Sequence, residues 1–368
     1  MPLPNAWYQP RFLFVAAVLL ATTLSRPGVA GEDTAPAGWP RAGAAADSGS
    51  PQVLVTGGTD ELIEMLKAED WWGEEKRGEQ MMVPHLILTG INPNWNTNAQ
   101  SLTVQDKKEL FYRLMLPLVL HANGMVTDYR AGLQQARGEL KADGKVSPGS
   151  LELLQRLVIL LPGSEEQYAD ALSVDNPELT EMIDDLLYRV DIVPAGLALG
   201  QAAYESGYGT SRFAREGNSL FGQWTYRGDG IVPGKQRKHL GNHQIKAFDW
   251  PFDSVRGYYI NLMSHPAYED FRRIRARLRE EGKPLDSLVL ADGLLSYSER
   301  GKEYVDSLKG MIRHNGLERA DNAAFRDEPV RFIISEDSPE DADKLRSEIE
   351  AMRNDGEVDL IVERMRLD

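Results

Sequence analysis

The sequence predicts a mainly α-helical fold of the α+β class with one small β element. From Val104 to about Lys141, apolar residues recur at three- and four-residue spacing, which is the period of an amphipathic helix. Two further helices are expected to begin at Ser147-Pro148 and at Pro194, because proline is favoured in the first turn of a helix. Between the helical segments, residues 225–250 have the pattern of a long β-hairpin.

The other elements follow in chain order. A helix is expected after Thr59, and the apolar run "VPHLILTGI" that follows it predicts a strand. Pro117 should kink the helix that begins at Val104 or end its first part. Another helix is expected from Pro177 to Val190, and the chain from Asp253 is again helical up to a glycine C-cap at Asn315-Gly316.

Composition excludes several classes of function. The chain has 368 residues, of which 42% are hydrophobic and 26% charged, so it can bury a substantial core. Its formal net charge of −15 argues against binding to nucleic acid, which requires a basic face. The absence of cysteine excludes disulfides, thiol catalysis and cysteine-ligated zinc.

The N-terminus has the features of an export signal. Positive charge at Arg11 precedes the apolar run Phe12–Leu24, which is too short to span a bilayer comfortably. Gly28-Val29-Ala30 supplies the small residues that a signal peptidase needs. We therefore expect a cleaved signal peptide over 1–30, a flexible linker over 31–50 and export to the periplasm in a bacterium. No stable membrane span is then expected after signal removal, and an uncleaved membrane anchor is the alternative.

Glu205 is the only charged side chain between Asp191 and Arg212. It should lie at the C-terminal end of a helix made of small residues, where burial and the helix dipole both disfavour a negative charge. These influences raise the pKa of a carboxyl, so Glu205 could donate a proton to the leaving oxygen of a glycosidic bond. The alternative is that Glu205 pairs with Arg212 or Arg215 and joins two helices.

A string of motifs follows Glu205 in fixed order. These are Gln201-Ala202-Ala203, Glu205-Ser206-Gly207-Tyr208-Gly209, Ser211-Arg212-Phe213-Ala214 and Gly217-Asn218-Ser219-Leu220-Phe221-Gly222. Together they resemble the β-N-acetylglucosaminidase domain of bacterial cell-wall hydrolases. Within that family the sequence is most similar to the bacterial Bax-type proteins, through the segments "DIVP", "GQW" and "GIVP".

The resemblance implies a lysozyme-like helical domain over 191–317 with a small β-hairpin. It would be preceded by a mostly helical region over 51–190. Independently of the resemblance, the acidic stretch 336–343 and the charged helix after it predict a solvated, acidic C-terminal appendage, which we assign to 318–368. The implied activity is hydrolysis of the β-1,4 bond after N-acetylglucosamine in the glycan strands of peptidoglycan. By this resemblance Glu205 is the catalytic acid and Tyr297 a supporting tyrosine in the cleft. The candidate substrate-binding residues are Tyr208, Asn218, Phe221, Trp224 and Tyr304, although Trp224 could instead pack in the core.

The second catalytic group is not assigned by the resemblance. Better-known members have a second acid on the hairpin, where this chain offers only Asp229. That aspartate lies in a Gly-Asp-Gly turn, in which aspartate is common for local hydrogen bonding. Asp249, Asp253 and Glu299 are weaker candidates, and capping explains Asp253 better. The remaining hypothesis is a single-acid mechanism, in which the substrate's own 2-acetamido oxygen attacks or Tyr297 orients water.

No cofactor and no metal are expected. His239 and His243 have a four-residue spacing that could suit zinc, but no third ligand is evident. Basic residues of the hairpin could hold the carboxylates of peptidoglycan, or could simply be solvated. Three alternatives to a glucosaminidase remain: a lytic transglycosylase, a catalytically silent peptidoglycan-binding scaffold, and an amide-bond hydrolase acting on the same polymer.

Overall fold

The computed structural model describes residues 52–72, 80–168, 171–173, 176–225, 230–234 and 243–354. The expected signal peptide over 1–30, the linker over 31–50, and Asp229 lie outside these residues. The described residues up to Ala342 belong to one compact unit, Pro40–Ala342, and the last helix continues from it into a second unit. Among the described residues, no helix combines the length and the apolar character needed to cross a membrane.

Helices predominate, as the sequence predicts. In chain order the helical elements are α2 (Thr59–Ala68), α3 (Trp95–Ser101), α4 (Val104–Asp143), α5 (Pro148–Leu160), α6 (Ser164–Tyr168), η1 (Ala171–Ser173), α7 (Asn176–Arg189), α8 (Ala195–Ser206), α9 (Arg212–Gly217), α10 (Pro251–Ser264), η3 (Pro266–Tyr268), α11 (Glu269–Glu280), α12 (Ser287–Leu290), η4 (Ala291–Leu294), α13 (Lys302–Asn315), η5 (Leu317–Asn322) and α14 (Pro339–Asn354). The strands are β1 (Gln52–Gly57), β2 (Met82–Val83), β3 (Leu86–Leu88), β4 (Trp224–Thr225), β5 (Gly230–Ile231), β6 (Gln244–Lys246), β7 (Ala324–Phe325) and β8 (Arg331–Glu336).

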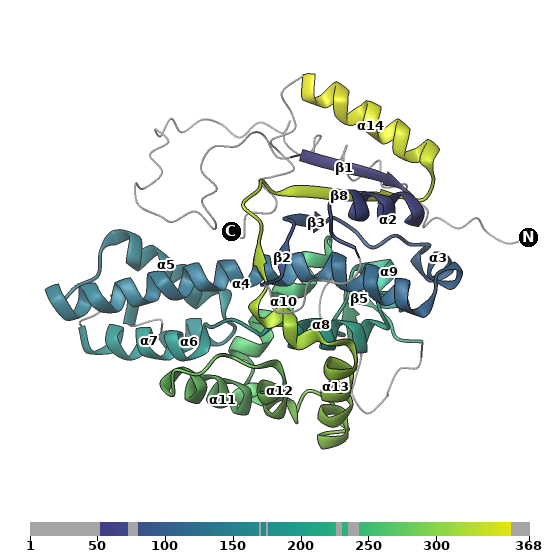
Figure 1. The fold of residues 1–368 in the computed structure, drawn as a ribbon. Helices are drawn as coiled ribbons and strands as arrows, with labels where there is room; N and C mark the ends of the chain where they lie inside the picture. The colour runs from purple at the N-terminus through teal and green to yellow at the C-terminus, as the bar shows by residue number, and fades with distance from the viewer. Residues whose placement is uncertain are drawn as a thin grey trace, which may run out of the picture. The chain divides into compact units, whose positions relative to one another are not determined.

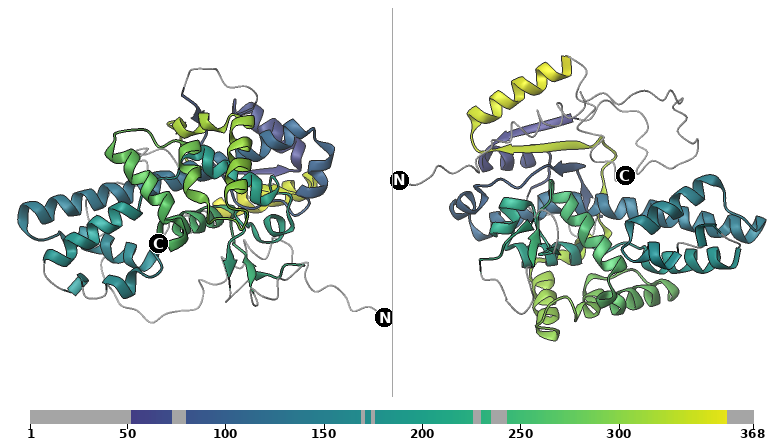
Figure 2. Two further views of the ribbon diagram at one scale, coloured as in Figure 1. Left: turned by 90° about the horizontal axis from the view of Figure 1, so that it is seen from below. Right: turned by 180° about the vertical axis from the view of Figure 1, so that it is seen from behind.

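Helix α4 is the central element of the compact unit. It begins where the Thr103 hydroxyl accepts a hydrogen bond from the Asp106 amide, and it ends at Gly144 in the left-handed conformation. The helix remains continuous over 40 residues and passes through Pro117, so the expectation that it ends there is wrong. Helices α5 and α7 pack against one part of it, and α8, α10 and β3 pack against another (Figures 1 and 2).

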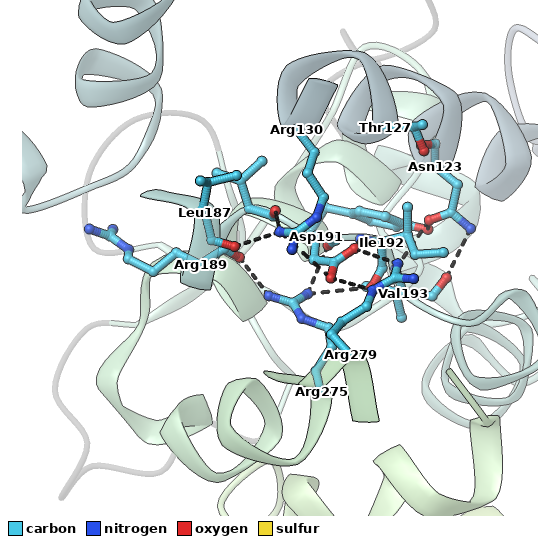
Figure 3. A network of polar contacts seen from close by, with 12 residues as sticks. Asn123, Thr127, Arg130, Leu187, Arg189, Asp191, Ile192, Val193, Arg275 and Arg279 are labelled. Atoms are coloured by element: carbon cyan, nitrogen blue, oxygen red, sulfur yellow. Dashed lines mark hydrogen bonds and ion pairs between the residues drawn. The ribbon is translucent and has the colours of Figure 1, made fainter. Parts of the chain in front are cut away.

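A buried polar network joins α4, α7 and α11 just before the helix that contains Glu205 (Figure 3). Asp191 is 2% exposed, and both of its carboxylate oxygens accept hydrogen bonds from Arg279, at 2.9 and 2.8 Å. Arg130 lies 3.7 Å from the same carboxylate. Arg275, which is 1% exposed, donates to the backbone oxygens of Asp191 and Arg189. Burial alone raises the pKa of Asp191, but the three guanidinium groups outweigh it and hold that pKa below its ordinary value.

A three-stranded parallel sheet with the order β1-β8-β3 corrects the expectation for the C-terminal part of the chain. The acidic segment from 318 onwards was expected to be a solvated appendage, yet β8 is the central strand, with Phe332 and Ile333 buried. Its register pairs Phe332 with Val53 on one side and with Ile87 on the other. Parallel strands of this kind are buried by partners distant in sequence, which the local charge pattern does not reveal. The 51–190 region likewise contributes β1 and β3 to this sheet.

Two smaller sheets complete the described fold. The expected hairpin forms an antiparallel sheet of order β4-β6-β5. In the second small sheet, β2 pairs with β7 in parallel. Much of the hairpin beyond β4, over 226–229 and 235–242, lies outside the described residues.

Candidate active site

Helix α8 brings Glu205 to the centre of the candidate site. Nearly all of the helix is buried, and its small residues allow other helices to approach closely. A Cβ atom at Gly200 would lie 2.8 Å from Ile312 of α13, and one at Gly196 would meet the Leu317 backbone. The glycines therefore serve helix packing, which offsets their cost of about 1 kcal/mol each.

The N-terminus of α8 is capped from a distant part of the chain. One oxygen of Asp321 accepts a hydrogen bond from the Gly196 amide at 2.9 Å, and the other accepts one from the Ser287 amide at 2.9 Å. The same carboxylate therefore caps the first turns of both α8 and α12. This contact ties the helix of Glu205 to η5, beyond the expected domain limit at 317.

The turn after Glu205 explains the sequence Ser-Gly-Tyr-Gly. Gly207, Tyr208 and Gly209 all have positive φ, at 58°, 58° and 75°. Glycine adopts this conformation without strain, whereas Tyr208 does not and must be held by its surroundings. The Ser206 hydroxyl donates to the Ala202 carbonyl and accepts from the Gly209 amide. The chain therefore reverses sharply just beyond Glu205 and enters α9, which the Ser211 hydroxyl caps.

The Glu205 carboxyl is half-buried. Burial raises its pKa above the ordinary value, and the neighbouring Tyr304 hydroxyl partly offsets that rise. Among the described residues, no second carboxylate contributes to the shift. The sequence therefore predicted the direction and the main cause of this perturbation correctly.

A directional chain of hydrogen bonds leads to Tyr304, whose hydroxyl influences the Glu205 carboxyl. The buried Tyr258 hydroxyl donates to Gln201 Oε1 at 2.6 Å, which fixes the orientation of the amide. Gln201 Nε2 then donates to the Tyr304 hydroxyl oxygen at 3.0 Å. With its oxygen occupied as an acceptor, Tyr304 has its own proton available for Glu205.

Aromatic side chains surround this relay. The rings of Tyr297 and Tyr304 stack at 5.6 Å with an interplanar angle of 8°. The Tyr297 hydroxyl donates to the Phe221 carbonyl at 3.1 Å rather than to Glu205. Phe221 is buried and stacks on Tyr258 at 4.1 Å. Glu205, Phe221, Tyr297 and Tyr304 are therefore brought together, and the aromatic wall lowers the local polarity around the acid.

The structure places the remaining candidate residues elsewhere. Tyr208 packs edge-on against Phe111 and Tyr112 of α4. The Asn218 amide donates to the backbone oxygens of Phe248 and Asp249, and its oxygen accepts from the Ile91 amide. Both residues thus make structural contacts in the loops around the site.

Trp224 differs from the expectation of core packing. Its side chain on β4 is 47% exposed, and its ring lies 4.6 Å from that of His243. The interpretation of Trp224 as a core residue is therefore wrong. An exposed indole on the hairpin sheet is available to stack on a ligand.

The charged residues near Glu205 in the sequence make other contacts. Arg212 pairs with Glu216, and Arg215 donates to backbone oxygens, so neither pairs with Glu205. The interpretation of Glu205 as a structural ion pair is wrong. Asp253 accepts a hydrogen bond from the Trp250 amide at the start of α10, as expected of a capping residue. Asp249 and Glu299 are exposed.

Within the part of the chain that the structure describes, no cluster of three or more His, Asp or Glu side chains could hold a metal ion. His239, one member of the candidate histidine pair, lies outside that part.

Three functional residues were missed from the sequence. Gln201 and Tyr258 build the relay to Glu205, and Asp321 caps its helix. Gln201 had a detectable signal, because a lone amide four residues before Glu205 must lie on the same helix face. Tyr258 and Asp321 had none, since their contacts depend on how distant helices pack.

Comparison with known proteins identifies a family for the chain. A sequence model of the glucosaminidase family, described as mannosyl-glycoprotein endo-β-N-acetylglucosaminidase, matches residues 181–317. Protein bax of Escherichia coli strain K12 is 30% identical over 210 residues, which cover 57% of this chain and 70% of the relative. The chain belongs to the family of Bax-type proteins with a glucosaminidase domain.

Membership of this family supports a glycosidase-type function related to peptidoglycan. The matched glucosaminidase segment contains Glu205, Tyr297 and Tyr304, and it excludes the whole parallel sheet. The fold is mainly α and lysozyme-like, as predicted. No solved structure matches the chain.

Proposed function

We propose that this protein is an exported peptidoglycan hydrolase, an endo-β-N-acetylglucosaminidase that cleaves the β-1,4 bond after N-acetylglucosamine. The observation that supports this most directly is the half-buried Glu205, whose raised pKa and Tyr304 partner suit a general acid. Because peptidoglycan lies outside the cytoplasm, we extend the proposal to the periplasm, with the apolar run Phe12–Leu24 as part of the export signal.

Glu205 acts as the proton donor in this proposal. Its raised pKa keeps the carboxyl protonated closer to neutral pH, where it can protonate the leaving glycosidic oxygen. As the proton leaves, the Tyr304 hydroxyl donates to the carboxylate that forms and stabilises its charge. Tyr297 acts in support, by stacking on Tyr304 and by fixing the Phe221 backbone.

The second step uses the substrate itself. We propose that the 2-acetamido oxygen attacks the anomeric carbon as the glycosidic bond breaks, and that water then opens the cyclic intermediate. This choice rests on the sequence of the hairpin, which offers only Asp229 as a second acid, in a Gly-Asp-Gly turn where local hydrogen bonding accounts for it. Asp229 is the competing candidate, and its replacement tests the choice directly.

Sugar binding is assigned mainly to Trp224. Its exposed indole offers an apolar face on which a sugar ring can stack, while its backbone is fixed in β4 by pairing with Ile245. Phe221 and Tyr304 shape the floor beside the acid. Tyr208 and Asn218 act indirectly, by holding the loops that border the site.

The decisive experiment is digestion of purified sacculi, followed by mass spectrometry of the soluble products. Wild-type protein should release fragments with reducing N-acetylglucosamine ends, and Glu205→Gln should release none. The matched control is Glu216→Gln, which changes an exposed glutamate of the next helix and should leave activity intact. Products with 1,6-anhydro rings would instead show a transglycosylase. Binding to sacculi without soluble product would show a scaffold.

Two further substitutions test the assigned roles. Tyr304→Phe removes the hydroxyl that lowers the Glu205 pKa, so the alkaline limb of the pH–activity profile should move to higher pH. Tyr297→Phe should move it less, because that hydroxyl bonds to a backbone carbonyl. Asp229→Asn should retain most of the activity, and its inactivity would overturn the single-acid mechanism.

A further inference from the structure

The turn that follows Glu205 is held by a segment that lies far away in the sequence. Trp95, at the start of α3, donates its indole Nε1–H to the Tyr208 carbonyl at 2.8 Å. The Trp95 ring also lies against Gly209, where an added Cβ would be 3.3 Å from Nε1. Tyr208 is the residue of that turn with a strained backbone, and this hydrogen bond holds its carbonyl from outside the turn.

Two more contacts join the same segments. Arg215 of α9 donates to the Thr210 carbonyl at 3.2 Å and to the Pro93 carbonyl at 3.0 Å, so it bridges the turn and the 91–95 segment. The Ile91 amide donates to Asn218 Oδ1 at 3.0 Å. The 91–95 segment therefore contacts the chain before, within and after α9.

The parallel sheet fixes the 91–95 segment in turn. Both the amide and the hydroxyl of Thr89 donate to the Ile333 carbonyl of β8, at 3.0 and 2.9 Å. Asn92 donates to the Glu336 carbonyl at 3.4 Å. A continuous series of contacts thus leads from β8, through the 91–95 segment, to the turn that carries the Glu205 helix into α9.

Trp95 is buried, and it lines a pocket together with Leu62, Phe111 and Met115. The indole hydrogen bond adds a directional contact to this packing. Removing the bond while keeping an aromatic ring should loosen the turn without unfolding the protein.

We propose that Trp95 is a positioning residue for Glu205. It acts from outside the matched glucosaminidase segment, by clamping the 206–211 turn against the 91–95 segment. This inference rests on the proposed function for its catalytic consequence, and the physical clamp can be measured separately. The β1-β8-β3 sheet then contributes to the active site indirectly, by fixing the 91–95 segment that holds the turn after Glu205.

The test compares Trp95→Phe with Trp71→Phe in the full chain. Trp71 is a matched control, because it is also buried and its indole also donates to a backbone carbonyl, that of Arg113 at 3.0 Å. Hydrogen exchange reports on the turn through the amides of Tyr208, Gly209 and Ser211, which are bonded to Ala203 and Ser206. We expect Trp95→Phe to speed exchange of these amides about 10-fold or more, and Trp71→Phe to leave them unchanged.

Activity on sacculi gives the second measurement. Misplacement of a catalytic group by about 1 Å can lower a rate about 100-fold. We expect Trp95→Phe to reduce kcat about 10- to 100-fold with little change in KM, and to shift the alkaline limb of the pH profile. Unchanged exchange in the turn would overturn the clamp whatever the activity. Faster exchange with a wild-type kcat would overturn the positioning role. If wild-type protein cleaves no glycan, the proposed function fails, while the exchange result still decides the clamp.

Discussion

Replacing Asp191 by Asn should destabilise the protein, because it removes the anion that balances a buried set of guanidinium groups. Asp191 bonds to Arg279 through both oxygens, while Arg275, buried beside it, has only backbone oxygens as hydrogen-bond partners (Figure 3). Breaking a buried ion pair typically costs about 3–5 kcal/mol. The Arg279 side chain is 40% exposed, so water compensates part of the loss and we expect about 3 kcal/mol, the lower end of that range.

That free energy corresponds to a measurable shift in melting temperature. An unfolding entropy of about 2.1 cal/mol/K per residue, over the roughly 300 residues of the unit Pro40–Ala342, gives about 0.6 kcal/mol/K. A loss of about 3 kcal/mol should therefore lower Tm by about 5 °C at pH 7. The contribution of Asp191 is present above its ordinary pKa of 3.8 and is lost as pH falls through its lower folded-state pKa.

Thermal unfolding followed by circular dichroism at pH 7 and near pH 3 measures both expectations. The difference between wild type and Asp191→Asn should shrink at the lower pH. Asp184→Asn is the matched control, since Asp184 pairs with Arg137 at the surface, 3.3 Å away with both side chains about half exposed. Its expected cost is below about 1 kcal/mol. An Asp191→Asn protein as stable as wild type at pH 7, or a difference independent of pH, would refute the reasoning.

Three further predictions concern other parts of the compact unit. Glu205→Gln should raise Tm at pH 7, because a carboxyl whose pKa is raised by folding destabilises the folded protein once it ionises. The difference in Tm between the variant and wild type should vanish below about pH 4, near the ordinary pKa of Glu, and melting curves measure it. Gly200→Ala should destabilise by about 1–3 kcal/mol, because its Cβ would meet a side chain of α13. Gly138→Ala, with open space around it, should stabilise α4 by about 0.5–1 kcal/mol, and denaturant titration that ranks the two alike would contradict this. Burial and neighbouring charge lower the pKa of His85 to about 4, and burial lowers that of His121 to about 4. The free energy of unfolding should therefore fall as pH drops from 6.5 toward 4. His121→Asn should reduce this dependence on pH, and the same slope of stability against pH in variant and wild type would count against the prediction.

Local sequence patterns determined most of the helical fold. The period of apolar residues located α4, the prolines located the starts of α5 and α8, and Gly316 located the end of α13, because these signals act within a few residues of the feature they specify. The position of Glu205 among small, uncharged residues was enough to predict that burial would raise its pKa.

Contacts between distant segments decided the rest. The charged segment after 318 gave no sign that β8 would be the centre of a parallel sheet, because its burial requires β1 and β3, which lie more than 200 residues earlier. The neighbour of Glu205 also depended on packing. Tyr297 and Tyr304 both occur in the matched segment, and only the tertiary structure shows that the Tyr304 hydroxyl affects the pKa of the acid, while the Tyr297 hydroxyl bonds to a backbone carbonyl.

The sequence by itself therefore determined that one carboxyl would be secluded at the end of a small-residue helix. Only the tertiary structure decided how that carboxyl is held, through the Tyr258–Gln201–Tyr304 relay on one side and the Trp95 clamp on the turn beyond it. The physical reason is that seclusion follows from residues adjacent in the chain. Orientation follows from hydrogen bonds whose donors and acceptors meet only when distant helices and strands pack together.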